Sequence, residues 1–298
     1  MPRLIASDFP REVLTLFDQY VHGGISRREF LDNAGRHAVG GMSAAGLLAA
    51  LSPDFASAQQ VAPGDSRIAT TFVDFDSPKG YGKARGYLAK PQGAAGKLPA
   101  VLVCHENRGL NPHIEDIARR LALEGYLAFA PDALFSLGGY PGDEDKARDL
   151  FAKLDQGKVQ ADFLAATAVL KARADVNGRV GTVGFCWGGG MVNYLATQWP
   201  DLAAGVPFYG MAPALQDVPR IKAPLLLHFA ANDERIDAAW PPYEAALKKA
   251  GVRYEAFIYP GTEHGFNNDT TPRFDAKAAG LAWARTLAFF KTNLHVAA

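Results

Sequence analysis

The sequence predicts an α/β protein whose central sheet is mostly parallel and covered by helices on both faces. From residue 67 to residue 298, short apolar runs alternate with longer helix-like segments, which is typical of repeated strand–helix units. The runs are apolar throughout, as expected for strands buried on both faces. With 298 residues, 48% of them hydrophobic, the chain can bury a large core.

Strands are expected where apolar or β-branched residues run between turn residues, and helices in the segments between them. The first two strands, separated by Gly80-Tyr81-Gly82, should form an antiparallel hairpin at one sheet edge. The expected strands are residues 68–76, 84–90, 99–104, 126–130, 179–184, 203–208, 223–229 and 253–259. The expected helices are residues 113–124, 143–154, 157–174, 188–198, 239–250 and 275–293.

Residues 184–188, Gly-Phe-Cys-Trp-Gly, have the Gly-x-nucleophile-x-Gly form of a nucleophile elbow, with Cys186 at its centre. A strand that turns sharply into a helix strains the middle residue and needs small flanking residues. The turn also aims the helix N-terminus at Cys186, which favours a thiolate over a thiol. The alternative is a buried structural cysteine in a glycine-rich turn.

Two further polar residues follow later strands. Asp233 comes after the apolar run 223–229, and His264 comes after the run 254–259. Nucleophile, acid and base occur in this chain order in proteins that carry such an elbow. His264 would keep Cys186 ionised or accept its proton, and Asp233 would orient the imidazole. Separately, Asp233 could be a turn or cap residue, and His264 a solvated surface residue.

The loop after the early strand 98–104 reads His-Glu-Asn-Arg-Gly-Leu-Asn over residues 105–111. In this kind of fold that loop and the residue after the nucleophile supply the oxyanion hole. The backbone N–H groups of Asn107 and Trp187 are therefore the candidates. Glu106 could set the protonation state of the thiol, or be an ordinary surface carboxylate.

Together, residues 105–111, 184–189, the Asp233 loop and residues 261–266 (Gly-Thr-Glu-His-Gly-Phe) resemble the dienelactone hydrolase family, the carboxymethylenebutenolidases. The resemblance extends over roughly residues 68–295. It implies an α/β-hydrolase fold with a cysteine nucleophile, no metal or organic cofactor, and a small-molecule ester or lactone as substrate. It also implies that Glu106 contacts the resting thiol and helps to generate the thiolate when substrate binds.

One segment departs from that family. Its best-known members bind the substrate carboxylate through arginines, one of them shortly after the catalytic histidine. Here Asn268 or Asp269 occupies that region, and Arg273 lies further on. Dienelactone itself is therefore not the expected substrate.

Candidate substrate-binding residues come from three places in the sequence. Arg108 could bind a substrate anion or form a surface salt bridge. The Gly/Pro-rich segment 131–142 follows a strand end and should border the pocket, with Tyr140 in its wall. Further candidates for that wall are Phe135, Trp187, Tyr209 and Phe266.

Charge and cysteine content exclude several classes of function. The 31 basic and 31 acidic residues balance, which argues against nucleic acid as a partner. Cys104 and Cys186 are the two cysteines, and a disulfide between them would consume the proposed nucleophile. Cys104 is expected to be a small core residue. No Cys-x-x-Cys motif or His/Cys cluster suggests a metal.

Residues 1–66 differ from the rest of the chain. Residues 26–31, Ser-Arg-Arg-Glu-Phe-Leu, match a twin-arginine export signal, and an Ala/Gly-rich apolar run follows at residues 38–51. Ala56-Ser57-Ala58 offers a cleavage site. The apolar run is too short to span a bilayer. If residues 1–58 are a signal, the protein is periplasmic; otherwise it is cytoplasmic.

The same segment could instead be a folded helical arm. Ser26 and Glu29 form a capping box, and a capped helix is expected from Asp8 onward, with Pro10 near its first turn. A retained arm would pack on the 67–298 domain or on a second subunit, which leaves a homodimer open. A reactive thiol also suits a reducing compartment. The residues expected on the apolar face of this helix are Val13, Leu14, Leu16, Phe17 and Val21.

The function expected from these residues is hydrolysis of small esters or lactones through an acyl-cysteine intermediate. Thioester hydrolysis is a close variant. The alternative from another class is a non-catalytic protein on the same fold that uses Cys186 as a ligand-binding or redox-sensing thiol.

Overall fold

A computed structural model describes residues 4–37 and 42–295 of the chain. Its eight-stranded sheet has the order β1-β2-β4-β3-β5-β6-β7-β8. β1 and β2 form the expected edge hairpin, β2 also runs antiparallel to β4, and the strands from β4 to β8 are parallel. The predicted α/β-hydrolase architecture is confirmed. The strands are β1 Ile68–Ser77, β2 Gly82–Pro91, β3 Leu98–Cys104, β4 Leu127–Pro131, β5 Val176–Phe185, β6 Ala204–Phe208, β7 Leu225–Asn232 and β8 Tyr254–Glu263.

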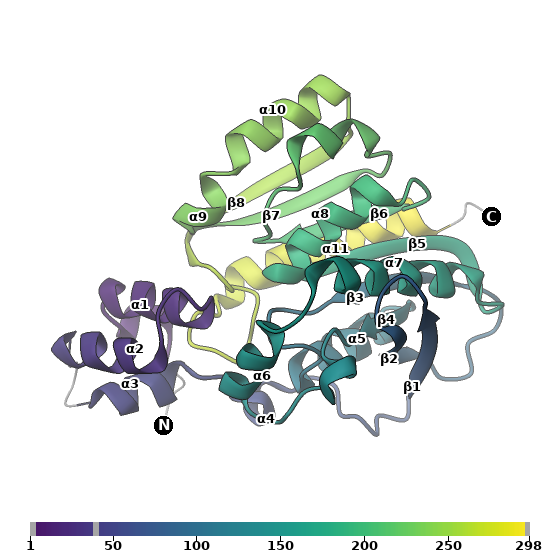
Figure 1. The fold of residues 1–298 in the computed structure, drawn as a ribbon. Coiled ribbons are helices and arrows are strands. Elements are labelled where there is room, and N and C mark those ends of the chain that lie inside the picture. The colour runs from purple at the N-terminus through teal and green to yellow at the C-terminus, as the bar shows by residue number, and fades with distance from the viewer. Residues whose placement is uncertain (1–3, 38–41, 296–298) are drawn as a thin grey trace.

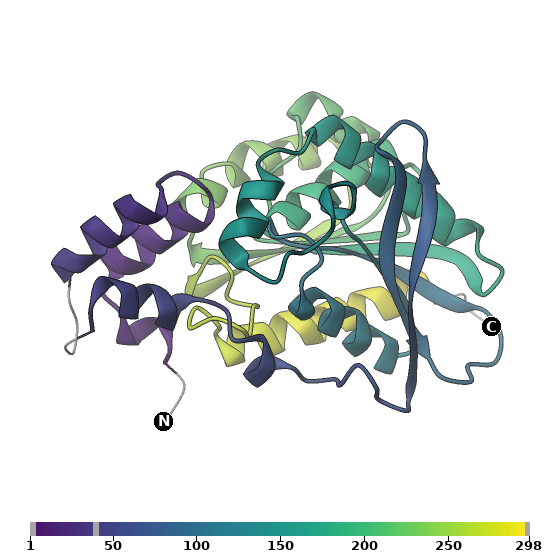
Figure 2. The same cartoon turned by 60° about the horizontal axis from the view of Figure 1, so that its bottom comes forward.

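Helices cover both faces of the sheet (Figure 2). On one face, α5 and α11 pack Ile114 and Phe290 into a core with Val101 and Val183. On the other face, the cores beneath α7, α8 and α10 contain Phe163 from α7. All six expected helices form, with small shifts at their ends. The domain helices are α5 Pro112–Leu123, α6 Glu144–Phe151, α7 Gln156–Ala172, α8 Trp187–Gln198, α9 Glu234–Asp237, α10 Trp240–Ala250 and α11 Ala276–Leu294.

The N-terminal residues fold into a small helical arm at one end of the sheet (Figure 1, purple). Its helices enclose an apolar cluster of their own, which includes Phe17, Phe30 and Leu47, all nearly or fully buried. The Ser26–Glu29 capping box is present at the start of α2. The arm helices are α1 Arg11–Val21, α2 Arg27–Ala34, α3 Ala44–Leu51 and α4 Phe55–Ala58.

The first arm helix starts later than expected. Residues Ala6–Asp8 form a separate 3₁₀ turn, and α1 begins at Arg11. Pro10 takes the N-cap position with an extended ψ of 144°, so the helix does not reach back to Asp8.

The segment read as an export signal is folded in this structure. The paired arginines lie in α2, part of the apolar run forms α3, and the Ala-Ser-Ala site lies in α4. Residues 38–41 of that run lie outside the described residues. Export therefore stays a prediction. No helix among the described residues is both long and apolar enough to cross a membrane.

A strained turn joins β5 to α8 and presents Cys186. This residue has φ 56° and ψ −115°, a backbone conformation that is costly for any residue with a side chain. Its flanking glycines are required by space: a Cβ on Gly184 would lie 2.2 Å from the Gly188 carbonyl oxygen, and one on Gly188 would lie 2.2 Å from the Cys104 carbonyl oxygen. The Cys186 N–H donates to the Phe208 carbonyl oxygen over 3.1 Å, which ties the turn to β6.

Replacing Gly188 by alanine should therefore lower the free energy of unfolding by roughly 2–3 kcal/mol or more, because the opposing atom is backbone and cannot move aside. Denaturant-induced unfolding measures this. The control is Gly280→Ala in α11, where an added Cβ meets nothing within 4 Å. That change should be neutral or stabilising by about 1 kcal/mol. Equal stability of the two variants would contradict the packing of the turn.

Candidate active site

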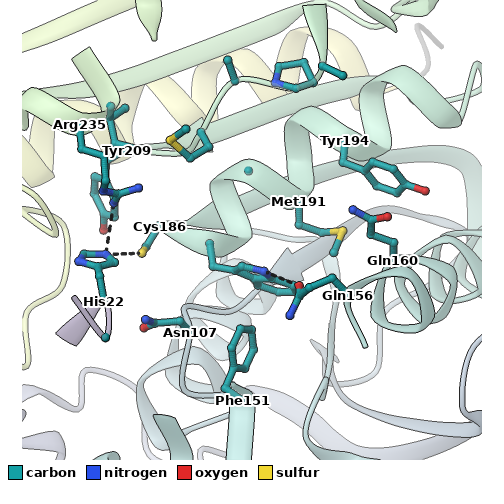
Figure 3. Close-up of a pocket in the computed structure, with 18 of the residues that line it drawn as sticks. His22, Asn107, Phe151, Gln156, Gln160, Cys186, Met191, Tyr194, Tyr209 and Arg235 are labelled. Atoms are coloured by element: carbon teal, nitrogen blue, oxygen red, sulfur yellow. Dashed lines mark hydrogen bonds between the residues drawn. The ribbon is translucent and has the colours of Figure 1, made fainter. Parts of the chain in front are cut away.

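The sulfur of Cys186 lies at the N-terminus of α8, with 8% of the residue exposed. Its hydrogen-bond partner is His22, which follows arm helix α1: Nε2 of His22 is 3.3 Å from Sγ (Figure 3). The sequence had indicated His264 or Glu106 at this place. The arm therefore reaches the atom that was proposed as the nucleophile.

His264 and Asp233 lie together beside this sulfur. Asp233 follows β7, His264 follows β8, and the two side chains are joined by a 2.5 Å contact between Oδ2 and Nδ1. The Nε2 atom of His264 is buried and has no hydrogen-bond partner among the described residues. The potential ligand atoms of His22, Cys186 and His264 all lie within 4.8 Å of one another.

Electrostatics at this cluster favour an ionised sulfur. Burial opposes ionisation, but the neighbouring His264 and His22 outweigh it and lower the pKa of Cys186 to about 6. Burial would lower the pKa of His264, whereas the charges of Cys186 and Asp233 raise that pKa to about 10. The pKa of His22 is raised in the same way, against burial, by Cys186 and Asp18. These shifts all favour a thiolate beside the two imidazoles.

The other cysteine has no such neighbours. Cys104 ends β3, is fully buried, and carries a free thiol. Burial raises its pKa far above the ordinary value. It packs as a core residue.

Glu106 lies close to the cluster but does not hydrogen-bond the thiol. Its Oε2 accepts a 2.8 Å hydrogen bond from the Asn268 side chain. It lines a cavity together with Cys186 and His264. Asn268 thus holds a carboxylate beside the cluster.

The two candidate oxyanion donors have different surroundings. Trp187 is the first residue of α8, where backbone N–H groups have no partner within the helix. Its indole stacks on His105, with ring centroids 5.3 Å apart, and donates to Gln156. Asn107 uses its side-chain amide to donate to the Val21 carbonyl oxygen of the arm over 2.9 Å.

Three of the expected substrate-binding residues, Arg108, Tyr140 and Phe266, make contacts within the protein. Arg108 is buried, donates to the Val21 carbonyl oxygen over 3.1 Å, and lies 3.7 Å from Glu144. The Tyr140 hydroxyl donates to Glu144 over 2.8 Å. Phe266 has no exposed surface and packs against Tyr209, so it supports the pocket wall from behind.

Arg273 also contacts the arm. Its Nη1 lies 3.4 Å from Oδ1 of Asp18, and its guanidinium lies over the Phe17 ring. Arg108 and Arg273 therefore both fasten the arm to the domain.

Two cavities meet at the sulfur. The larger, about 780 Å³, has a mainly apolar wall (Figure 3). The smaller, about 390 Å³, lies between arm and domain. His22, Asn107 and Cys186 line both. The apolar wall of the larger cavity comes from Phe151, Trp187, Met191, Tyr194, Tyr209 and Met211.

His22, Cys186 and His264 are also the described residues that could hold a metal ion. Two imidazole nitrogens and a thiolate are ligands that suit Zn²⁺. An ion bound there would occupy the sulfur and both imidazoles.

Sequence reasoning did not find His22 or its neighbour Asp18. His22 ends an amphipathic helix and is followed by two glycines, a pattern that indicates a helix end and nothing more. Its role depends on where the arm docks, which no local pattern encodes.

Comparison with known proteins places the domain and the arm in separate groups. The model of the dienelactone hydrolase family matches residues 84–294. A second family model, described as YqhI-like, matches residues 1–39.

Individual proteins agree with the first match. A protein of Escherichia coli K12 named "Putative hydrolase fragment YghX" is 53% identical over 114 residues, covering 38% of this chain and 97% of its own length. A "Putative carboxymethylenebutenolidase" of Synechocystis is 34% identical over 227 residues, covering 70% and 92%. A crystal structure titled "Putative Dienelactone Hydrolase" from Klebsiella pneumoniae has a TM-score of 0.67 at 30% identity, covering 75% and 99%.

Alkylation by iodoacetamide should report the ionised sulfur directly. The rate at Cys186 should rise through about pH 6 and level off, because the reactive thiolate is complete above that pKa. An unperturbed thiol would instead rise through about pH 8.5. Peptide mapping separates Cys186 from Cys104, which should react only after unfolding. If the alkylation rate of Cys186 instead rose near pH 8.5, that result would contradict a thiolate stabilised by the neighbouring imidazoles.

Proposed function

Because the chain belongs to the dienelactone hydrolase family, we propose that it hydrolyses small esters or lactones with Cys186 as nucleophile and an acyl-cysteine intermediate. The observation that carries this proposal is the Cys186 sulfur, presented on a strained elbow at a helix N-terminus beside an imidazole that a carboxylate orients. No step of the reaction calls for a metal or an organic cofactor.

Acylation begins with the thiolate. The sulfur attacks the carbonyl carbon, a C–S bond forms, and the carbonyl electron pair moves to oxygen. The backbone N–H groups of Asn107 and Trp187 would stabilise that oxyanion. When the C–O bond to the leaving group breaks, His264 protonates the departing oxygen through Nε2, while Asp233 stabilises the imidazolium.

Deacylation uses the same groups in reverse. Neutral His264 takes a proton from water as the water oxygen attacks the acyl carbon. The C–S bond then breaks and the sulfur leaves as thiolate, which returns the site to its starting charge. The unpartnered Nε2 of His264 is available for both transfers.

Glu106 would influence the charge of the Cys186 sulfur without reacting itself. Its hydrogen bond to Asn268 holds the carboxylate at the cavity that also contains Cys186 and His264. A movement of this carboxylate on substrate binding would change the field at the sulfur.

The substrate class follows from the larger cavity. Its mainly apolar wall and volume of about 780 Å³ suit an ester or lactone with an aryl or alkyl group. Arg108 and Arg273 are engaged with the arm, so recognition of a substrate carboxylate by these two is not part of the proposal. A thioester could use the same acyl-cysteine route, and a panel of lactones, aryl esters and thioesters ranks the three classes.

Replacing Cys186 by alanine should reduce kcat for a p-nitrophenyl ester by about 10³-fold or more, because the bond-forming atom is lost. Cys104→Ala is the matched control. It removes the chain's other thiol outside the described site and should retain turnover. Equal rates in wild type and Cys186→Ala would reject the nucleophile assignment. Absence of turnover in the wild type on the whole panel would favour the sensor alternative.

A further inference from the structure

Two Asp–His pairs converge on one sulfur in this protein. One is Asp233–His264 of the domain. The other is on the arm, where His22 Nδ1 lies 2.8 Å from the Asp18 carbonyl oxygen and 3.3 Å from the Asp18 carboxylate. A carbonyl oxygen can only accept, so Nδ1 of His22 carries a proton and Nε2 faces Sγ.

The position of His22 is fixed by contacts on both sides. The carbonyl oxygen of Val21, the preceding residue, accepts hydrogen bonds from the Asn107 amide and the Arg108 guanidinium. Arg108 is only 5% exposed, so the contact is part of the protein interior. Asp18 is held in turn by Arg273.

Further contacts dock the adjoining helices. The Tyr20 hydroxyl and Arg27 both bond to Asp145 of α6. Arg148 lies over the Tyr20 ring, 4.6 Å from its centroid. The arm thus contacts the loop after β3, helix α6 and the segment after β8, all at the same end of the sheet.

The docked arm leaves the site accessible. The larger cavity still reaches Cys186 and His22 with the arm in place. The two imidazole rings lie 4.8 Å apart at 83°, so they approach the sulfur from different directions. His22 contacts the sulfur, and His264 lines the smaller cavity, which also reaches the sulfur.

From this geometry we propose that the arm completes the active site: His22, oriented by Asp18, is a second catalytic imidazole that pairs with the Cys186 sulfur and leaves His264 free for proton transfer. The inference rests on the proposed function. His22 carries its second proton on Nε2 when it faces the thiolate, and the Arg235 guanidinium, which can only donate, must then turn away from Nε2. Before attack, its Nε2–H donates a hydrogen bond to the thiolate. The same hydrogen bond forms again when the C–S bond breaks and the sulfur regains its charge.

The charged and titratable groups around His22 define the pH behaviour. The nearest are Cys186, His264, Asp18 and Arg235, whose Nη2 lies 3.4 Å from His22 Nε2. A positive His22 adds to the stabilisation of the thiolate, so its removal makes the sulfur harder to ionise. Further charged groups that line the smaller cavity with His22 are Arg27, Glu106, Arg108, Asp143, Glu144, Asp145 and Arg273.

The test compares three variants of the full chain. His22→Gln removes the positive charge but keeps a polar side chain of similar reach. Asp18→Asn leaves His22 in place without its carboxylate. The control is His37→Gln, which changes the arm's other histidine, outside both cavities at the sulfur. Two readouts are taken, kcat/KM for a p-nitrophenyl ester and the pH at which Cys186 alkylation reaches half its maximal rate.

For His22→Gln we expect kcat/KM to fall by at least about 10-fold and the half-rate pH of alkylation to rise by about one unit, because one of the two imidazolium charges is lost. Asp18→Asn should also lower kcat/KM and raise the half-rate pH of alkylation, but both changes should be smaller than in His22→Gln. His37→Gln should match wild type.

The results that would contradict a role for His22 differ from those that would contradict the proposed hydrolase activity. An unchanged alkylation profile in His22→Gln and Asp18→Asn, with Cys186→Ala inactive, would overturn the role of His22 and leave the hydrolase standing. A higher kcat/KM in His22→Gln would show that the arm blocks the site, which also overturns it. If His22→Gln releases the arm, seen as faster trypsin cleavage at Arg27 and Arg28, the profile of Asp18→Asn decides.

Discussion

The pairing of one buried sulfur with imidazole is the interaction on which the chemistry of this protein depends. A buried thiol ordinarily resists ionisation, as Cys104 shows in the neighbouring strand, where burial raises its pKa. Cys186 is also buried, yet its pKa is lowered to about 6. The two cysteines differ in their neighbours: Cys186 faces two imidazoles and the N-terminus of α8. The strained elbow is what brings the sulfur to them.

The parallel sheet explains how distant residues reach this sulfur. The loops after β3, β5, β7 and β8 leave the same edge of the sheet, so they bring together Glu106, Cys186, Asp233 and His264. The arm docks at that edge too and adds His22. A site assembled from four strand ends therefore gains a fifth contributor from a segment that precedes the sheet in sequence.

Much of this could be predicted from local sequence patterns. The apolar strands, the glycines around Cys186 and the positions of Asp233 and His264 after strands are local signals, and the structure places these residues as the patterns indicate. The partner of the sulfur was not predictable, because it depends on how the arm docks. That docking uses contacts such as Val21 with Arg108, 87 residues apart in the chain. The contacts of Arg108 with Val21 and of Phe266 with Tyr209 were not predictable for the same reason, because these partners are distant in sequence.

The most direct test of the central claim is mass spectrometry of the wild-type chain quenched with acid during turnover of an aryl ester. An acyl-cysteine intermediate predicts a transient mass increase equal to the acyl group, located on the peptide that contains Cys186 and absent once substrate is exhausted. Steady turnover with no acyl group on Cys186, or with the acyl group on another residue, would contradict it.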